Sequence, residues 1–393
     1  MNNWTQVRAA DFVEFNPRLS IKKGTMATKV GMDKLQPFTK KIPATEQAEF
    51  AGGSKFCNGD TIMARITPCL ENGKTAFVDV LAEGEVAFGS TEFIVMRAKA
   101  GVSDPQFVYY LATSPAFRNV AIKSMVGSSG RQRVQQSVLD KLELTVPPLE
   151  EQKKIGDFLA ALDQKIAQNN QINDNLQEQA QILFAERFCL RGDIVPEDWA
   201  LVSLGDVAII FNKSFNPLKQ PETMLEHYSI PAFDETRYPV FELSTAIKSN
   251  KFIVDADCFM ISKLNPTTKR VWRPYCMTDN AVCSTEFIVY KAKERMLTDF
   301  LYSLIDSVPF SDYMCSHVTG STGSRQRTIP SNTLQYQFYL PTTEEIAAFS
   351  AVVAPMYAQI RINAIENARL KDLRDSILPR LMSGEIDVCD IQL

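Results

Sequence analysis

The residues of this chain that could do chemistry form a short basic motif that occurs twice. Arg131-Gln132-Arg133 returns 194 positions later as Arg325-Gln326-Arg327, and serines precede both copies. Guanidinium groups and amides on a loop suit contacts with phosphates and base edges. The motif therefore has two interpretations, a contact with nucleic acid or a role in the framework of both halves of the chain.

Motifs for nucleotide or cofactor chemistry do not occur in the sequence. Gly320-Ser321-Thr322-Gly323-Ser324 lacks the lysine of a phosphate-binding loop, and no Gly-x-Gly-x-x-Gly or Gly-x-Ser-x-Gly segment appears. Val146-Pro147-Pro148-Leu149 has Val where an amino-methyltransferase would have Asn or Asp. The 8 cysteines form no Cys-x-x-Cys pair, and the 2 histidines lie at no ligand spacing. We therefore expect no catalysis, no metal site and no bound cofactor.

The whole chain is duplicated in one register. Ser90-Thr91-Glu92-Phe93-Ile94-Val95 returns unchanged as Ser284-Thr285-Glu286-Phe287-Ile288-Val289, and Trp4 and Trp199 open the two copies. The period is too long for a solenoid, so it implies two similar units. A length of 393 residues with 45% apolar content allows two or three domains with real cores.

Each copy is predicted to hold a globular α+β part followed by a long helix. Residues 92–96 and 286–290 have the β-branched and aromatic content of buried strands, so we expect twisted, mainly antiparallel sheets with helices. The expected domains are globular at 1–145 and 191–340 and helical at 146–190 and 341–393. Pro355 lies inside the second helical pattern, where it either kinks the helix or marks its true start.

Apolar residues in both helical parts recur at alternating steps of three and four, the rhythm of a coiled coil. Each helix would be about 60 Å long, and we expect an antiparallel coiled coil with pseudo-two-fold symmetry. Two asparagines in each helix would lie at the seam, where they cost stability and fix register; the alternative is that they face solvent. The expected interface residues are Leu162, Ile166, Asn169, Asn173, Leu176 and Leu183 in the first helix and Met356, Ile360, Asn363, Asn367, Leu370 and Ile377 in the second.

The charge of the chain argues against a strong DNA binder that acts alone. The net charge is −4, although residues 1–145 carry 18 basic and 14 acidic side chains. Few phosphates can then be neutralised, so we expect weak DNA affinity without a more basic partner. No apolar run of about 18 residues occurs, and the start of the chain has no signal-like segment. With its scattered cysteines the chain is expected in a reducing cytoplasm.

Taken together, these residues resemble the specificity (S) subunit of type I restriction–modification systems. The resemblance rests on Trp-x-x-Val-x-x-x-Asp openings at Trp4 and Trp199, on the duplicated Ser-Thr-Glu-Phe strands and on residues 146–155, VPPLEEQKKI. The ending at 377–386, ILPRLMSGEI, is also similar to the family. The second copy reads LPTTEEI at 340–346 and lacks the second Pro and the Gln-Lys-Lys, which puts the start of its helix in doubt.

The resemblance implies two target-recognition domains, each of which binds one half of a split, asymmetric DNA sequence. The helices would set the spacing of the half-sites and dock two methyltransferase subunits, and restriction subunits would complete the nuclease. S-adenosylmethionine, ATP and magnesium would be held by those partners. The less symmetric cations would be better placed to discriminate bases, while matched ones would contact phosphates or support the framework. The candidate DNA contacts are Lys22, Lys23, Arg65, Lys74, Ser128, Ser129, Arg131, Arg133, Lys213, Lys263, Lys269, Arg270, Arg273, Ser324, Arg325 and Arg327.

Two other functions stay open from the sequence. The chain could be a tandem DNA-binding regulator without methyltransferase partners, although long paired helices offer docking area that a regulator does not need. It could also be an enzyme with an unrecognised active site, such as a nuclease. The target bases, the spacer length and the presence of a restriction partner do not follow from the sequence.

Overall fold

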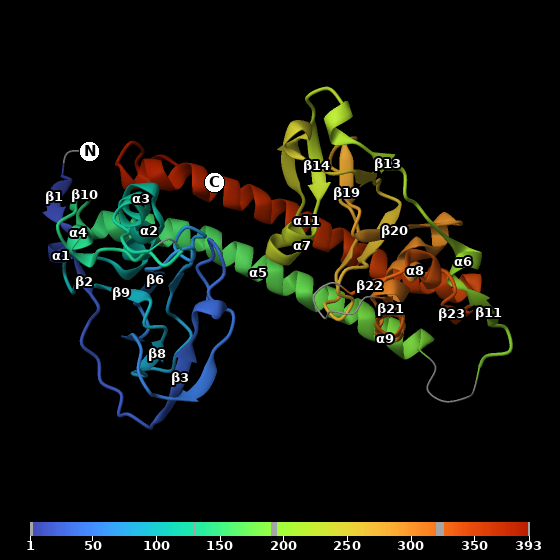
Figure 1. Ribbon diagram of the computed structural model, residues 1–393, viewed down its shortest axis with the longest axis horizontal. Coiled ribbons are helices and arrows are strands. Elements are labelled where there is room, and N and C mark those ends of the chain that lie inside the picture. The colour runs from blue at the N-terminus through green and yellow to red at the C-terminus, as the bar shows by residue number, and fades with distance from the viewer. Residues whose placement is uncertain (1–2, 129, 190–194, 320–325, 392–393) are drawn as a thin grey trace. The chain divides into compact units, whose positions relative to one another are not determined.

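The computed structural model describes residues 3–128, 130–189, 195–319 and 326–391, which form an α+β protein with two compact units (Figure 1). Unit 1 comprises Met1–Ile166 and Arg369–Leu393, and unit 2 comprises Ala167–Ala368. The helices α5 (Leu149–Phe188) and α11 (Thr343–Met382) have 40 residues each, and both units contain a part of each. The expected α+β class is confirmed.

Unit 1 contains two four-stranded sheets and a two-stranded ribbon. The first sheet has the order β2-β9-β6-β7 and is antiparallel, whereas the second, β4-β3-β8-β5, has one parallel pair, β3 with β8. The ribbon joins β1 to β10, just before α5. The elements are β1 (Thr5–Arg8), α1 (Ala9–Phe12), β2 (Val13–Phe15), β3 (Met26–Val30), η1 (Met32–Lys34), β4 (Glu46–Glu49), β5 (Lys55–Phe56), β6 (Thr61–Ala64), β7 (Thr75–Phe77), β8 (Ala87–Gly89), β9 (Phe93–Ala98), α2 (Pro105–Thr113), α3 (Pro115–Lys123), α4 (Gln136–Asp140) and β10 (Glu143–Val146).

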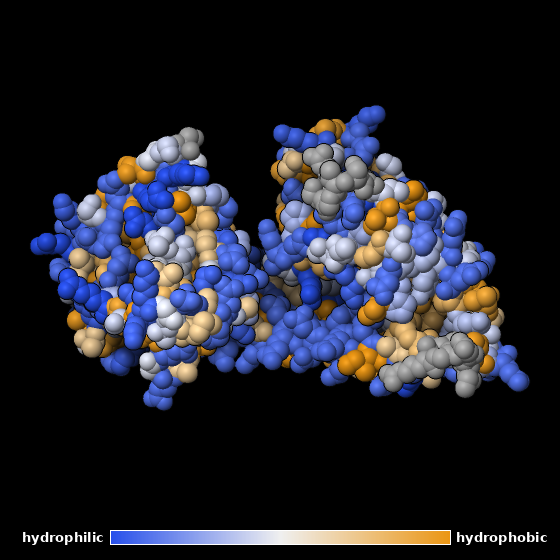
Figure 2. All heavy atoms as spheres, turned by 60° about the horizontal axis from the view of Figure 1, so that its bottom comes forward, coloured by the Kyte–Doolittle hydropathy of each residue, from blue (hydrophilic) through white to orange (hydrophobic). Residues whose placement is uncertain are grey.

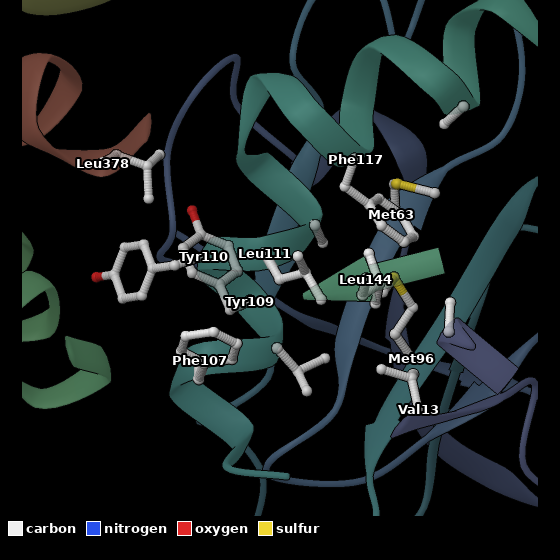
Figure 3. Packing of buried hydrophobic residues seen from close by; sticks show 14 of the residues in the cluster. Val13, Met63, Met96, Phe107, Tyr109, Tyr110, Leu111, Phe117, Leu144 and Leu378 are labelled. Atoms are coloured by element: carbon white, nitrogen blue, oxygen red, sulfur yellow. The ribbon is translucent and has the colours of Figure 1, made fainter. Parts of the chain in front are cut away.

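Two capped helices contribute buried side chains to the core of unit 1. Asp104 and Ser114 cap α2 and α3, their side chains accept main-chain N–H groups of the first turn, and a proline follows each cap. Helix α2 is buried along most of its length. Figure 3 shows Leu378, from the last turns of α11, beside the tyrosines of α2. Leu378 belongs to the same core as Leu159 of α5, so both long helices complete this unit.

Among the described residues, unit 2 repeats this plan with three additional strands, one in its second sheet and two that pair as a separate ribbon, β21-β22. Its sheets have the orders β12-β20-β17-β18 and β13-β16-β19-β14-β15, and again one pair, β14 with β19, is parallel. Its ribbon joins β11 to β23, just before α11. The elements are β11 (Ala200–Ser203), α6 (Leu204–Val207), β12 (Ala208–Ile210), β13 (Ser214–Phe215), η2 (Pro217–Lys219), β14 (Met224–Tyr228), α7 (Ile230–Thr236), β15 (Val240–Leu243), η3 (Ser244–Ala246), β16 (Lys251–Ile253), β17 (Cys258–Ser262), β18 (Val271–Trp272), β19 (Ala281–Ser284), β20 (Phe287–Ala292), η4 (Arg295–Leu297), α8 (Thr298–Asp306), α9 (Val308–Ser316), β21 (Val318–Thr319), β22 (Arg327–Thr328), α10 (Pro330–Thr333) and β23 (Gln337–Leu340); η5 (Val388–Asp390) follows α11 in unit 1.

The duplicated tryptophans fasten each ribbon to the helix that follows it. Trp4 Nε1 donates to Glu151 Oε1 at 3.0 Å, and Trp199 Nε1 donates to Glu345 Oε2 at 2.8 Å. Both glutamates stand in the first turns of their helices, where a carboxylate is also favoured by the helix dipole. The same contact between a tryptophan and a helix glutamate therefore occurs once in each copy of the duplicated sequence.

The predicted strands at 92–96 and 286–290 are confirmed as β9 and β20, which are buried over most of their length. For Pro355, the alternative that it marks the start of the second helix is wrong, since α11 begins at Thr343 and continues through it. A kink at Pro355 stays a prediction. Gly384, at φ +70°, follows the end of α11, because glycine adopts this left-handed conformation without strain.

The surface carries many polar side chains. Figure 2 shows hydrophilic residues over much of the visible face, with apolar residues between them. Among the described residues, no helix has the length and apolar character needed to span a membrane.

Candidate nucleic-acid interface

The second arginine of the first motif is part of the framework. Arg133 lies in the loop between α3 and α4 and forms bridges with Ile66 and Val126. Its guanidinium donates three hydrogen bonds to the Glu92 carboxylate, at 3.0, 2.9 and 2.6 Å. These bonds hold the pKa of Glu92 below its ordinary value. The duplicated Ser-Thr-Glu-Phe segment and the duplicated Arg-Gln-Arg motif therefore contact each other directly.

Unit 2 makes the same contact with the same residue types. Arg327, at the start of β22, donates to the Glu286 carboxylate at 3.0 and 3.1 Å. A charge-assisted bidentate pair of this kind fixes orientation as well as position. The framework interpretation therefore fits Arg133 and Arg327, whose guanidinium groups already have an acceptor.

The tip of the first loop is exposed to solvent. Ser128 and Arg131 are exposed, and no ion pair of Arg131 is found within the described part of the chain. The predicted contacts Ser129, Ser324 and Arg325 lie outside the described residues. In unit 1, the Arg133–Glu92 pair thus holds the base of a loop whose tip presents Arg131.

Four of the less symmetric cations are engaged by neighbouring oxygens. Lys74 Nζ donates to the main-chain carbonyl of Met32 at 2.9 Å. In unit 2, Lys269 Nζ lies 2.8 Å from the Asp306 carboxylate. The other two are Arg270, bound to Asp234 at 2.6 and 2.9 Å, and Arg273, bound to Asp299. The local positive charge of the three unit 2 cations is largely compensated, which makes them weaker candidates for DNA contacts than their types suggest.

The remaining basic candidates lie nearer the solvent. Lys22 and Lys23 are exposed in the loop between β2 and β3, and Lys213 is exposed after β12. Arg65 follows β6 and Lys263 follows β17, and both are half-buried. The structure brings Arg65 together with Arg133, since both approach Glu92.

Sequence reasoning missed two cations close to Arg65. Arg18 and Lys55 line a cavity of about 360 Å³ with it, next to Thr91 of the duplicated segment. The duplication could have found Arg18, because it precedes the matched strands in the same way as Lys213. Lys55 has no such signal, since its partners along the cavity are distant in sequence.

The asparagines of the two long helices contact each other within unit 2. Asn169 Nδ2 donates to Asn367 Oδ1 at 2.9 Å and to Glu366 Oε2 at 2.7 Å. Asn363 Nδ2 donates to Asn173 Oδ1 at 2.8 Å. The contact residue in α5 that comes later in the chain, Asn173, meets the one in α11 that comes earlier, Asn363. The two helices therefore run antiparallel in this unit.

The apolar interface residues divide between the units. In unit 1, Leu162 and Ile377 are buried in its main core and Leu370 packs against that core, while Ile166 is half-buried. In unit 2, Leu183, Met356 and Ile360 pack against its main core, and Leu176 is half-buried.

A buried ion pair also joins the helices within unit 1. Arg374 Nη1 lies 2.5 Å from Asp163 Oδ1, and both side chains are 11% exposed. Asp163 Oδ2 in turn accepts from the Tyr110 hydroxyl of α2 at 2.6 Å. Arg374 lies at a seam position of the helical pattern. A cation is accommodated there because the Asp163 carboxylate of α5 compensates its charge.

Comparison with known proteins shows which sequences this chain is similar to. Residues 1–178 match the family model described as "Type I restriction modification DNA specificity domain". The HindI type I restriction enzyme specificity subunit of Haemophilus influenzae is 24% identical over 408 residues, covering 84% of this chain and 86% of that protein. The EcoEI specificity subunit of Escherichia coli is 30% identical over 175 residues, covering 43% of this chain and 29% of that subunit. The EcoEI match therefore spans less than a third of that relative.

A solved structure supports the fold. The crystal structure of a type I restriction–modification system S subunit from M. genitalium matches 96% of both chains with a TM-score of 0.54 at 14% identity. The architecture is therefore that of this class of subunit. The sequence matches show that the chain is similar to type I restriction enzyme specificity subunits, and that residues 1–178 match the specificity domain of this family.

Proposed function

We propose that this chain is the DNA-recognition subunit of a type I restriction–modification complex, and that each unit binds one half of a bipartite, asymmetric target. The observation that carries the proposal is the repeated Arg–Glu framework, Arg133 with Glu92 and Arg327 with Glu286. Two units with one framework and different surrounding surfaces suit the reading of two different half-sequences. Phosphate contacts would position each unit, and the divergent loops would read bases.

In this proposal α5 and α11 serve as the spacer and the docking surface for two methyltransferase subunits. Restriction subunits would join the same complex, and S-adenosylmethionine, ATP and magnesium would be bound by these partners. The chain would have no catalytic activity of its own and would act in the cytoplasm. Its net charge of −4 fits weak DNA binding by the chain alone.

Co-purification from the host followed by sequencing of methylated DNA tests this function. We expect methyltransferase subunits to accompany the chain, and a methylated motif with two fixed half-sequences around a gap of fixed length. A chain that co-purifies with no methyltransferase and represses transcription would be a regulator. Methylation or cleavage of DNA by the pure chain would mean that it is itself an enzyme.

The spacer role has a separate test in helix length. Four residues inserted at matched positions in α5 and α11 would add about 6 Å to each helix and about 40° of rotation. Base pairs are spaced by about 3.4 Å, so the gap of the methylated motif should grow by one or two base pairs. Both half-sequences should stay the same. An unchanged gap with full activity would leave the helices as a docking surface only.

A further inference from the structure

The cavity of about 360 Å³ in unit 1 is lined by three cations and by no carboxylate. Arg18, Lys55 and Arg65 line it together with the hydroxyl-bearing Ser54 and Thr91. Hydroxyl groups and cations without an acid among them form an environment that favours an anion with several acceptor oxygens.

Arg65 is only loosely engaged by its acidic neighbour Glu92, which Arg133 holds more closely. Its Nε is buried without a hydrogen-bond partner and lies 4.0 Å from Glu92 Oε2. Glu92 receives three hydrogen bonds from Arg133. A buried donor without a partner destabilises the protein, and an acceptor oxygen that reached this Nε from the cavity would satisfy it.

Unit 2 keeps a cation at the position of Arg65. The Arg65 main-chain N–H donates to the Glu92 carbonyl at 2.9 Å, and the Lys263 N–H donates to the Glu286 carbonyl at 2.9 Å. These identical main-chain contacts place Arg65 and Lys263 at equivalent points of the two units. The charge is therefore retained in both copies, while the guanidinium group is not.

A second cation of the cavity also has a cation at the equivalent position of unit 2. Asn16 N–H donates to the Val95 carbonyl at 2.7 Å, and Phe211 N–H donates to the Val289 carbonyl at 2.8 Å. Two residues further along each chain segment stand Arg18 and Lys213. Arg18 of unit 1 therefore corresponds to Lys213 of unit 2, so arginine is again replaced by lysine.

The exchange of arginine for lysine distinguishes between two kinds of DNA contact. Arginine and lysine both contact guanine edges, but the planar fork of arginine fixes a geometry that lysine does not reproduce. A phosphate accepts either residue, because lysine binds it as a point charge. The two units keep a positive charge at these positions but not the shape of the side chain. This pattern favours a contact with a phosphate over a contact with a base edge.

We propose that this cavity binds one phosphate of the target DNA backbone through Arg18, Lys55 and Arg65, and so sets the position of unit 1 on the duplex without reading a base. The inference rests on the proposed function, since it assumes that unit 1 contacts DNA. Lys213 and Lys263 make the corresponding contact in unit 2.

The test uses the complex purified from its host and a duplex with the motif found by methylation sequencing. Arg65→Gln and Arg18→Gln remove one charge each, and Arg65→Lys restores the residue type of unit 2. Lys123→Gln, at the exposed end of α3, removes the same charge outside the cavity. Affinity is measured against salt concentration, for the cognate duplex, for duplexes with single base changes and for duplexes with one neutral methylphosphonate.

Arg65→Gln and Arg18→Gln should each weaken binding and lower the slope of log affinity against log salt by about 0.9. The ranking of the base-changed duplexes should stay the same, and one methylphosphonate position should lose its effect in Arg65→Gln. Arg65→Lys should retain most of the affinity, and Lys123→Gln should match the wild type. Arg18 is exposed, so its variant keeps the test valid if Arg65→Gln fails to fold.

Two results would overturn the proposal while leaving the proposed function intact. A relaxed preference at one base with an unchanged salt slope would mean that the cavity reads a base. Unchanged affinity in both glutamine variants would mean that the cavity does not contact DNA. A wild-type complex that does not prefer the cognate duplex over a scrambled one would instead refute the proposed function itself.

Discussion

Replacing the four seam asparagines with leucine should stabilise unit 2. Asn169 is 0% exposed and Asn363 is 4% exposed. The Asn169 side-chain carbonyl is buried without a hydrogen-bond partner, which costs about 1–3 kcal/mol. A fully buried leucine contributes about 1.5–3 kcal/mol. Changing all four asparagines at once removes their mutual partners together.

The gain is partly offset by lost hydrogen bonds. Each bond between the asparagines contributes about 1 kcal/mol. Glu366 also loses the donor that Asn169 provides, and the exposed Gln359 and Asn170 exchange their asparagine partners for water. The balance is a gain of about 2 kcal/mol, which corresponds to about 4–8 °C in melting temperature for a unit of this size. Asparagine at a seam also fixes register, so spin-label distances between α5 and α11 should become broader in the variant.

Thermal unfolding of the quadruple variant measures the effect. Two controls accompany it. Asn169→Leu alone deprives Asn367 and Glu366 of a donor and should give no gain, and Asn175→Leu, at an exposed position of α5, should change stability by less than about 0.5 kcal/mol. A quadruple variant that melts below the wild type would show that the asparagine contacts are net stabilising, which contradicts the reasoning.

Three further predictions concern unit 1. Arg131→Ala should weaken DNA binding by the complex and lower the salt slope by about 0.9 without changing base preference; a relaxed preference with the slope intact would indicate direct readout. Burial lowers the pKa of Lys40 to about 8, so the folded state releases this proton before the unfolded state does, and stability gains as pH rises from 8 towards 10. Urea unfolding between pH 7 and 9.5 should show that Lys40→Met removes this gain in the free energy of unfolding, which is about 1–2 kcal/mol. Curves of unfolding free energy against pH that run parallel for the two proteins would count against the prediction. Trp4→Phe loses the bond to Glu151 and should cost about 1–2 kcal/mol in thermal unfolding. An equal loss from Trp4→Phe with and without Glu151→Ala, which removes the acceptor, would show that the bond contributes nothing.

Periodic and repeated features of the sequence predicted the elements well. The strands β9 and β20 are hydrophobic over consecutive residues, and the alternating three-and-four spacing predicted two helices that the structure shows as 40 residues each. The duplication also indicated a framework role for matched residues, and the contacts of Arg133 and Arg327 fit that interpretation. Such features follow from local spacing, which a sequence displays directly.

Pairings between distant residues could not be predicted in this way. Arg270 looks like a free surface cation until Asp234 is brought beside it by the fold. Arg374 meets Asp163, which is 211 positions away, so its charge at a helix seam has no explanation in the sequence. Whether a cation is free for DNA depends on these partners, and therefore the predicted DNA contacts included compensated residues such as Arg270.

The most direct test of the account is an exchange of residues 1–145 for the corresponding part of a relative with a different target. The chimaera is expressed with its methyltransferase subunits, and the methylated motif is determined by sequencing. The account predicts that one half of the motif changes to that of the relative, while the other half and the gap length stay the same. A motif in which both halves change, or in which neither does, would contradict the claim that each unit reads its own half.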